Sequence, residues 1–409
     1  MRLRSVAVLR GSRDFRLLWL GQFTSEFGSA VAFVATPMIA IAVTGSLTQA
    51  GLLGTVSYLT SWLGAVPMGH LADRVAPRRL MLACDAVRLV VSVVLAVGVT
   101  AGYLSLELLA GCAVVSALAM LGFRPAASKL LRALLPAEQL PTAVAANQVR
   151  GQLAALAGPA VGGGLFHLGR SIPLVVDAVS YAVSLCCVGS LRPAAVAPPP
   201  DTGPRSGFGY GFRLVWEMPF LRALTAYGII TNFAVSMVLF ALILGPGAAS
   251  GGAAIGTALS VGAIAAMVGS MVAPRLHRAL GLPALLLVVV GVRLVTTLGA
   301  ALLGGPVAAI VALAAVLLLQ PVAGAATETA RMLIVPADVY GRMSGTTSFL
   351  TSALPPIAPL LAGAVLDTAG AGWAFGIVAA LFAAAGLVVA VSAAALTIGT
   401  APVPAAHPQ

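Results

Sequence analysis

Ionisable side chains are rare in this sequence, and those inside long apolar stretches are the ones that could do chemistry. The chain has 409 residues, of which 23 are Lys or Arg and 12 are Asp or Glu. A charged group at the centre of a membrane-spanning helix costs about 2.5 to 3.5 kcal/mol on insertion scales, so such groups mark functional positions. Glu26 is the most deeply placed acid, and Arg150 and Asp177 follow it.

Glu26 shares one predicted helical face with Gln22 and Ser29, which lie four residues before it and three after it. That face is expected to line a central cavity. Because burial disfavours the charged form of a carboxyl group, we expect Glu26 to exchange a proton and, when ionised, to attract a cationic ligand. The alternative is a structural glutamate that hydrogen-bonds to neighbouring helices or pairs with a buried arginine.

Other polar positions are weaker candidates for the same cavity. Arg150 and Asp177 are predicted to lie closer to a membrane face, where water solvates them. Asn232 aligns with Glu26 in an internal repeat described below. Asp85 and Arg88 are one helical turn apart, and we expect them to form a structural ion pair.

The elements that must position these residues are membrane-spanning helices. Hydrophobic residues make up 60% of the chain and charged residues 9%, too few polar groups to cover a soluble globule. Apolar runs of about 20 residues or more are typical of spanning α-helices, whereas a β-barrel would show short alternating segments. We predict an all-α integral membrane protein with twelve spans, near residues 16–43, 48–70, 79–99, 104–123, 140–166, 172–191, 220–244, 252–273, 283–303, 307–328, 342–366 and 372–397.

The distribution of basic residues predicts the orientation. Five arginines precede the first span, and nearly all other bases fall in or beside every second connection, whereas the intervening connections carry only Arg170. The positive-inside rule then places both termini in the cytoplasm and the protein in the cell membrane. Because the bases are dispersed among loops, the net charge of +11 reflects topology, and no nucleic-acid partner is expected.

Several kinds of chemistry lack their usual residue patterns. Lys129 is the only lysine and has no Gly-x-x-x-x-Gly-Lys-Ser/Thr loop around it, so an ATP-driven pump is not expected. The four histidines and four cysteines show no metal-ligand spacing, and no nucleophile, base and oxyanion donors cluster as in an enzyme. We therefore predict no catalytic residues, metal or cofactor, and an ion gradient as the energy source.

The chain divides into two related halves. We predict a cytoplasmic N-terminus at 1–15, a six-helix bundle at 16–191, a linker at 192–219, a second bundle at 220–397 and a disordered tail at 398–409. Aromatic residues between 208 and 216 indicate either an interfacial helix or an ordinary aromatic belt. Arg88-Leu89-Val90 matches Arg293-Leu294-Val295, and Ser25-Glu26-Phe27 matches Thr231-Asn232-Phe233, so the two bundles are expected to be pseudo-symmetric.

Two motifs carry a family resemblance. Gly69, Leu71, Asp73, Arg74 and Arg78 fit the pattern Gly-x-Leu-x-Asp-Arg-x-Gly-Arg-Arg/Lys, with Ala76 and Pro77 as departures. This sequence resembles the signature loop of the major facilitator superfamily. Gly158, Pro159, Gly162 and Gly163 resemble the Gly-Pro-x-x-Gly-Gly element of its proton-coupled exporters; a helix-packing motif without transport direction is the alternative. With Phe15 to Gln22, these residues are similar to the branch of enterobactin exporters and macrolide or drug efflux proteins.

The resemblance implies a transporter with two six-helix bundles and alternating access. It implies a conformational gate at Asp73, Arg74 and Arg78, although these bases could serve topology alone. Members of the branch commonly carry an acid at the position of Ser29, so the role carried over to Glu26 is displaced by one turn. We expect export of a small amphipathic drug, antibiotic, secondary metabolite or siderophore by proton antiport, from a monomer. A proton-coupled importer and, less favoured, a non-transporting membrane protein or enzyme are the alternatives.

Overall fold

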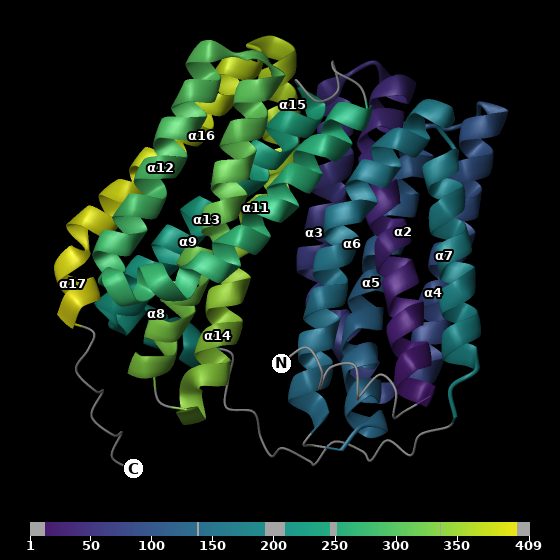
Figure 1. Cartoon of the computed structure of the whole chain (residues 1–409), viewed down its shortest axis with the longest axis horizontal. Helices are drawn as coiled ribbons and strands as arrows, with labels where there is room; N and C mark the ends of the chain where they lie inside the picture. Colours follow the sequence, from purple (N-terminus) through teal and green to yellow (C-terminus); the bar gives the residue numbers. More distant parts are fainter. Residues whose placement is uncertain (1–12, 137–138, 193–208, 246–251, 336, 399–409) are drawn as a thin grey trace. The chain divides into compact units, whose positions relative to one another are not determined.

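The structure is a computed structural model that describes residues 13–136, 139–192, 209–245, 252–335 and 337–398, except the side chains of a few residues such as Asp73. These residues are helical almost throughout and contain no β-strand (Figure 1). Most of the predicted N-terminal segment, of the linker and of the tail falls outside the described residues, although α2 already begins at Arg13. The expected all-α architecture is confirmed for the rest.

The helices follow the predicted spans closely. The first half of the chain holds α2 (Arg13–Thr44), α3 (Leu47–Arg74), α4 (Pro77–Ala101), α5 (Leu106–Leu134), α6 (Leu140–Leu168) and α7 (Ile172–Gly189). The second half holds α8 (Gly209–Glu217), α9 (Pro219–Leu244), α11 (Gly252–Ala279), α12 (Leu282–Leu303), α13 (Gly305–Ile334), α14 (Ala337–Thr351), α15 (Ala358–Thr368), α16 (Ala371–Val391) and α17 (Ala393–Ile398).

Within the described residues, ten helical segments are long and apolar enough to cross a membrane. The helices α3 and α6 are not among these, although they contain 28 and 29 residues. Both are long enough to span, because about 20 residues cross the hydrocarbon core. Their lower hydropathy reflects polar and small side chains, which favour contact with other helices over contact with lipid.

The chain forms two compact units. The first unit contains α2 to α7 and the beginning of α11, up to Ser260. The second contains α8, α9, the remainder of α11 and the helices from α12 onward. Each unit packs its own helices together, with α2 against α6 and α7 in the first and α12 against α13 and α16 in the second.

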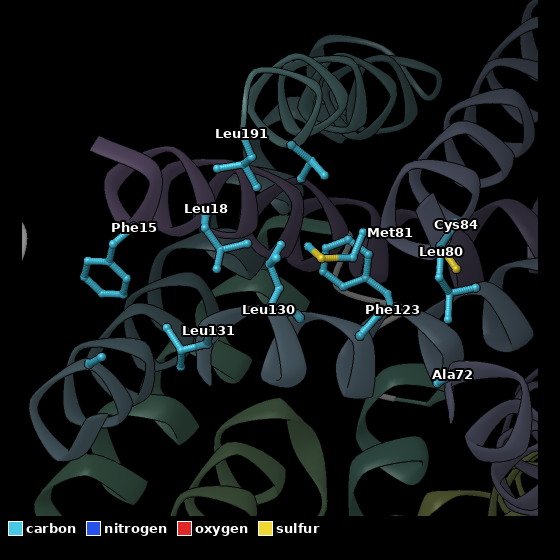
Figure 2. Close-up of a cluster of buried hydrophobic side chains, with 14 of the residues drawn as sticks. Phe15, Leu18, Ala72, Leu80, Met81, Cys84, Phe123, Leu130, Leu131 and Leu191 are labelled. Carbon is cyan, nitrogen blue, oxygen red and sulfur yellow. The ribbon is translucent and has the colours of Figure 1, made fainter. Parts of the chain in front are cut away.

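A cluster of buried apolar side chains joins α2, α3, α4 and α5 in the first unit (Figure 2). Phe15 and Leu18 come from the start of α2, Met81 from α4 and Leu130 from α5, and all four are at most 2% exposed. The cluster includes Ala72, near the end of α3, and so it fixes the connection between α3 and α4. Burying each large side chain stabilises the packing by about 1.5 to 3 kcal/mol.

Pro77 explains how the loop between α3 and α4 departs from the family pattern. It occupies the first turn of α4, where a missing backbone N–H costs nothing because that group would have no helical partner. The helix α3 ends at Arg74, so only Val75 and Ala76 separate the two helices. The signature residues therefore lie on the last two turns of α3 and the first turn of α4.

The predicted eleventh span is not one continuous helix. The helix α14 stops at Thr351, a 3-10 turn covers Pro355–Ile357, and α15 begins at Ala358. Pro355 and Pro356 have no N–H with which to bond the carbonyls of Thr351 and Ser352 four residues earlier. The sequence-based range 342–366 missed this break, since it weighed hydropathy without the effect of adjacent prolines.

A short helix precedes the first span of the second unit. The helix α8 packs against α9 and α14, where Phe212 contacts Phe349 with ring centroids 6.4 Å apart. Val215 is buried, whereas Trp216 on the same helix is 75% exposed. This division into a packed and an open face is what the interfacial-helix interpretation expects.

Gly158 and Gly162 bring α6 into close contact with α2. A Cβ atom at Gly158 would lie 2.4 Å from the Cβ of Ala30, and one at Gly162 would lie 2.3 Å from the carbonyl oxygen of Val31. Both distances are too short for a real contact. With any other residue at either position, the two helices could not approach each other this closely. Gly163 and Pro159 are also buried, and α6 continues through Pro159. The helix-packing interpretation of this motif therefore has a direct geometric basis.

We predict that Gly162→Ala lowers the stability of the protein by about 1 to 3 kcal/mol, since the added methyl group must displace the backbone of α2. Thermal unfolding of the purified protein in detergent measures the effect. Gly164→Ala is the matched control, because a Cβ there would meet nothing within 4 Å. Equal shifts of the unfolding midpoint in both variants would contradict the close-packing role.

Candidate functional site

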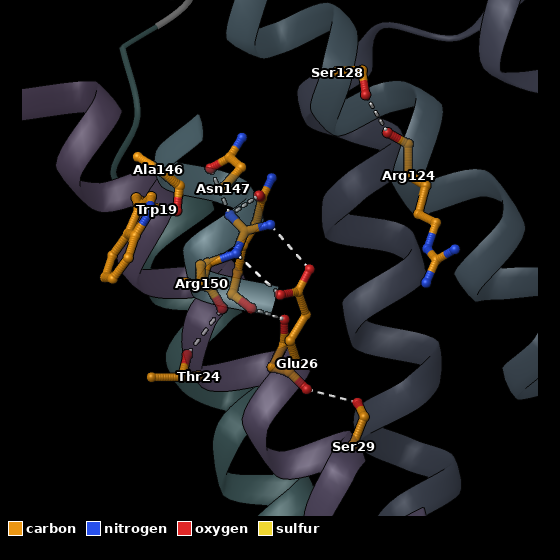
Figure 3. Close-up of polar contacts among 12 residues, drawn as sticks. Trp19, Thr24, Glu26, Ser29, Arg124, Ser128, Ala146, Asn147 and Arg150 are labelled. Carbon is orange, nitrogen blue, oxygen red and sulfur yellow. Dashed lines mark hydrogen bonds and ion pairs between the residues drawn. The ribbon is translucent and has the colours of Figure 1, made fainter. Parts of the chain in front are cut away.

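Glu26 on α2 and Arg150 on α6 form an ion pair inside the first unit (Figure 3). Arg150 donates from Nε to Oε2 of Glu26 at 3.1 Å and from Nη2 to Oε1 at 3.0 Å. Two parallel bonds of this kind are the strongest and most directional geometry for a guanidinium and a carboxylate. The Arg150 side chain is 7% exposed, but that of Glu26 is 37% exposed, so one partner remains accessible.

Two amides complete the environment of Arg150. Its Nη1 donates to the side-chain oxygens of Gln22 on α2 and of Asn147, one turn earlier on α6. The predicted polar face of α2 therefore does bring Gln22 and Glu26 together, on one arginine. The structure matches the alternative in which Glu26 pairs with a buried arginine, and proton exchange at Glu26 stays a prediction.

A second polar cluster lies between α2, α4 and α7. Arg88 donates from Nη2 to Oγ of Ser29 at 3.0 Å, and its guanidinium lies 4.3 Å from the ring centroid of Tyr181. Tyr181 also hydrogen-bonds to Ser29, at 2.8 Å. Ser29 is the third member of the predicted α2 face, so this face connects both clusters.

The two acids of this second cluster bind serines. Asp85 accepts a hydrogen bond from Ser184 at 2.6 Å, and Asp177 accepts one from Ser92 at 2.7 Å. Both carboxylates interact electrostatically with Arg88. Within the described part of the chain, Asp85 and Asp177 each retain one buried oxygen without a hydrogen-bond partner. The cluster therefore holds two carboxyl groups against one guanidinium.

Two expectations about these residues differ from the structure. Asp85 and Arg88 do not form an ion pair within 4 Å, because Arg88 is turned toward Ser29 and Tyr181 while Asp85 binds Ser184. Arg150 and Asp177 are 6% and 7% exposed instead of solvated. Arg150 bonds to α2 and Asp177 to α4, so both side chains face other helices of the first unit. A position near the end of a predicted span says nothing about which face a side chain occupies.

The signature loop contributes bonds inside the first unit. Arg78 on α4 donates from Nε to the carbonyl of Val188 at 3.1 Å and from Nη2 to that of Gly189. These carbonyls end α7, where free acceptors and the helix dipole favour a cation. Lys129 on α5 similarly donates to the carbonyl of Ala72 near the end of α3, at 2.8 Å. Arg74 is exposed and Gly69 has open space around it, whereas the side chain of Asp73 lies outside the described residues.

In the second unit, Asn232 on α9 donates to the carbonyl of Thr351 at 3.5 Å. This is one of the carbonyls released by the prolines after α14. Asn232 also lines a cavity together with Arg293, Gln320, Glu328 and Arg331. Sequence reasoning missed Glu328 and Arg331 because they lie at and beyond the end of the predicted span 307–328, and it missed Gln320 because this residue carries no charge. Arg293 was noted only in the internal repeat, and the signal for it was its position in the middle of an apolar run.

Comparison with known proteins identifies the family. Residues 18–353 match the family model of the Major Facilitator Superfamily. The chain belongs to the major facilitator superfamily. Members of this superfamily are secondary transporters, so the chain belongs to a transporter family, not an enzyme family. The family match and the helices described above confirm the predicted fold of twelve spanning segments in two six-helix bundles.

Solved structures support the same fold for this facilitator protein. A mutant of the nucleoside transporter NupG is 11% identical with a TM-score of 0.76, and the match covers 93% of this chain and all of that one. A bacterial homologue of the iron transporter ferroportin, inward-facing, is 15% identical with a TM-score of 0.73 and coverages of 93% and 98%. A bacterial homologue of the human lysosomal transporter Spinster is 15% identical with a TM-score of 0.65 and coverages of 95% and 96%. No curated protein is similar enough in sequence to count as a relative.

We predict strong energetic coupling between Glu26 and Arg150. Glu26→Gln is expected to cost about 3 to 5 kcal/mol, since it leaves the buried guanidinium of Arg150 without its counterion. Arg150→Gln is expected to cost less, because the carboxylate of Glu26 that it leaves unpaired is partly solvated. The double variant should fall short of the sum of the single costs by about 0.5 to 3 kcal/mol, measured by unfolding of the purified protein.

The exposed pair Arg213 and Glu217 on α8 provides the control for that measurement. These side chains are 75% and 58% exposed and 2.7 Å apart, so water screens their interaction. Their single and double variants should be additive. Additivity at Glu26 and Arg150 as well would show that the pair does not hold α2 and α6 together.

We also predict that Arg78→Gln destabilises this facilitator protein by about 1.5 to 3 kcal/mol, through loss of two charged hydrogen bonds at the end of α7. Arg79→Gln is the matched control, because Arg79 is the next residue of α4 and is exposed. The unfolding midpoints of both variants test the assignment. A larger effect for Arg79 would refute it.

Proposed function

We propose that this protein is a proton-coupled exporter of a small amphipathic molecule such as a drug, antibiotic, secondary metabolite or siderophore. It would act in the cell membrane with both termini in the cytoplasm, by alternating access. The observation that carries the proposal is the ion pair of Glu26 with Arg150, which couples an accessible carboxylate to a buried guanidinium on another helix.

Protonation of Glu26 would switch off the ion pair that joins α2 to α6. A proton on the carboxyl group removes its charge and weakens both bonds to Arg150. Arg150 is then a buried cation that lacks a counterion, an arrangement that typically costs several kcal/mol. The helices or a bound substrate must compensate, and this requirement links proton uptake to a change of conformation or of affinity.

The cluster around Arg88 offers a second place for protons. Asp85 and Asp177 lie near one guanidinium, which donates to Ser29 instead, and each has an oxygen without a hydrogen-bond partner among the described residues. Like-charged carboxylates in a shared site favour taking up a proton. Ser29 connects this cluster to the helix that bears Glu26, so both sites could respond to the movement of α2.

Export is the favoured direction because Gly158, Pro159, Gly162 and Gly163 resemble the exporter element. An importer that uses the same proton site in symport is the alternative. For the loop between α3 and α4 we propose a conformational gate in which Asp73 has the specific role, with Gly69 and Arg74 beside it. Arg78 would support this gate from the end of α7. The protein would function as a monomer.

Transport in liposomes tests the proposal. The protein is reconstituted with a lumenal pH indicator, a pH gradient is imposed, and the flux of rhodamine 6G as a cationic probe and of fluorescein as an anionic probe is recorded. We expect gradient-driven flux of at least one dye with opposite proton movement, and loss of most of this flux in Glu26→Gln. Glu107→Gln is the control, since Glu107 is exposed at the start of α5.

The results separate the alternatives. Movement of dye and protons in the same direction would favour the symporter. Flux that persists unchanged in Glu26→Gln and after collapse of the gradient would refute proton coupling at this residue. Chemical modification of a dye without its movement would refute transport.

A further inference from the structure

The second unit contains a polar cavity of about 200 Å³ between α9, α12, α13 and the end of α14. These four helices can be followed in Figure 1. Most of the lining is polar and includes Tyr227, Asn232, Arg293, Gln320 and Arg331. A volume of this size holds a small molecule or the head of a larger one, and none of the residues discussed for proton coupling lines it, except Asn232.

Arg293 is the most unusual side chain of this cavity. It projects from the middle of α12 and is 0% exposed, and Phe382 lies beneath its guanidinium at 5.6 Å. Its Nη2 donates to the side chain of Gln320 at 2.8 Å and to the carbonyl of Val316 at 3.1 Å. Both acceptors are neutral, and no described carboxylate forms an ion pair with Arg293.

Three buried donor atoms around the cavity have no acceptor among the residues that the structure describes. They are Nε of Arg293, the hydroxyl of Tyr227 and Nε of Arg331. A buried donor without a partner costs about 1 to 3 kcal/mol, and more when the group is charged. Because the side chains of Arg293 and Tyr227 are over nine-tenths buried, bulk water does not offset this cost. The cavity therefore lacks hydrogen-bond acceptors, not donors.

The charges of the cavity agree with this conclusion. Arg331 is paired with Glu328 at 3.5 Å, whereas the charge of Arg293 is not neutralised by a described residue. The first unit differs, because Arg150 has Glu26, and Arg88, which matches Arg293 in the repeat, has Asp85 and Asp177 nearby. The described acid of the cavity, Glu328, is paired with Arg331 and not with Arg293. Arg293 therefore remains a buried cation, and a buried cation requires a counterion.

We propose that this cavity binds the anionic group of a small molecule, a carboxylate or an oxyanion of similar size, with Arg293 as its counterion. Tyr227 and Arg331 would donate to the same anion, and Thr231, Asn232 and Thr327 would bind polar groups beside it. Leu224 and Ala323 provide apolar contact for the rest of the ligand. This inference rests on the proposed transport function and names the charge of its substrate, which is opposite to the cation expected from Glu26 alone.

Direct binding tests this proposal without any gradient. Benzoate, benzamide and benzamidinium have nearly the same shape and carry charges of −1, 0 and +1. Each is titrated by calorimetry into the full chain in nanodiscs of neutral phosphatidylcholine, with empty nanodiscs as the blank. We expect benzoate to bind at least about tenfold more tightly than benzamide, as charged hydrogen bonds imply, and benzamidinium to bind most weakly.

Variants locate the site. Arg293→Gln should remove the preference for benzoate, and Arg278→Gln, an exposed arginine of α11 in the same unit, should leave it unchanged. Thr327→Val changes the cavity wall without changing charge, and should weaken benzoate and benzamide alike. Gel filtration checks the folding of each variant, and the three-probe series on the unaltered chain tests the proposal even if Arg293→Gln does not fold.

The outcomes are distinguishable from those of the transport assay. No measurable binding of benzoate, equal binding of the three probes, or an unchanged preference in Arg293→Gln would overturn the anion site and leave proton coupling at Glu26 intact. Repeating the titration in nanodiscs with phosphatidylglycerol separates two sources of the same chemistry. Competition would identify the headgroup of an anionic lipid as the natural anion, and unchanged affinity would identify a soluble anion.

Discussion

Buried guanidinium groups impose the strictest requirement on this structure. A guanidinium carries a permanent charge and five N–H donors, and it cannot be neutralised by losing a proton within a protein. In an interior made of apolar helices, each such group must therefore be surrounded by acceptors from several directions. Arg88, Arg150 and Arg293 are all at most 8% exposed, and the polar residues of both units gather around them. The remaining interior is free to pack as alanine, leucine and glycine.

The helix α2 is the element on which the first unit depends most. Its residues Ala30 and Val31 pack closely against the glycines of α6, and its polar residues bind the arginines of both α4 and α6. Tight apolar packing and charged hydrogen bonds thus act on the same helix within a few turns. A displacement of α2 cannot leave one set of contacts intact while changing the other. A change in the ion pair of Glu26 that moves α2 therefore also changes the contacts of Ser29, one turn away.

The fold could be predicted almost completely from sequence, and the site only in part. Hydropathy and basic loops set the spans because lipid penalises polar surface along the entire length of a helix. The pairing of Glu26 with Arg150 was open, because helical spacing gives the face of a residue on its own helix but not the face of the helix that meets it. Arg293 illustrates the same limit. The cavity that it lines is formed together with Gln320, Tyr227 and Arg331, which are distant from it in sequence. The break near Pro355 was readable in principle, from two adjacent prolines.

The break after α14 has a mechanical meaning of its own. The helices α14 and α15 contain 15 and 11 residues, so they are about 22 Å and 16 Å long, and neither alone crosses a hydrocarbon core of about 30 Å. The span therefore consists of two short helices joined by a hinge. Thr351, which is held by Asn232 and borders the cavity, lies at the joint. Rotation of a few backbone dihedrals there would tilt one of the two short helices while the other stays packed. The wall of the cavity can therefore move without an entire helix sliding through the bilayer.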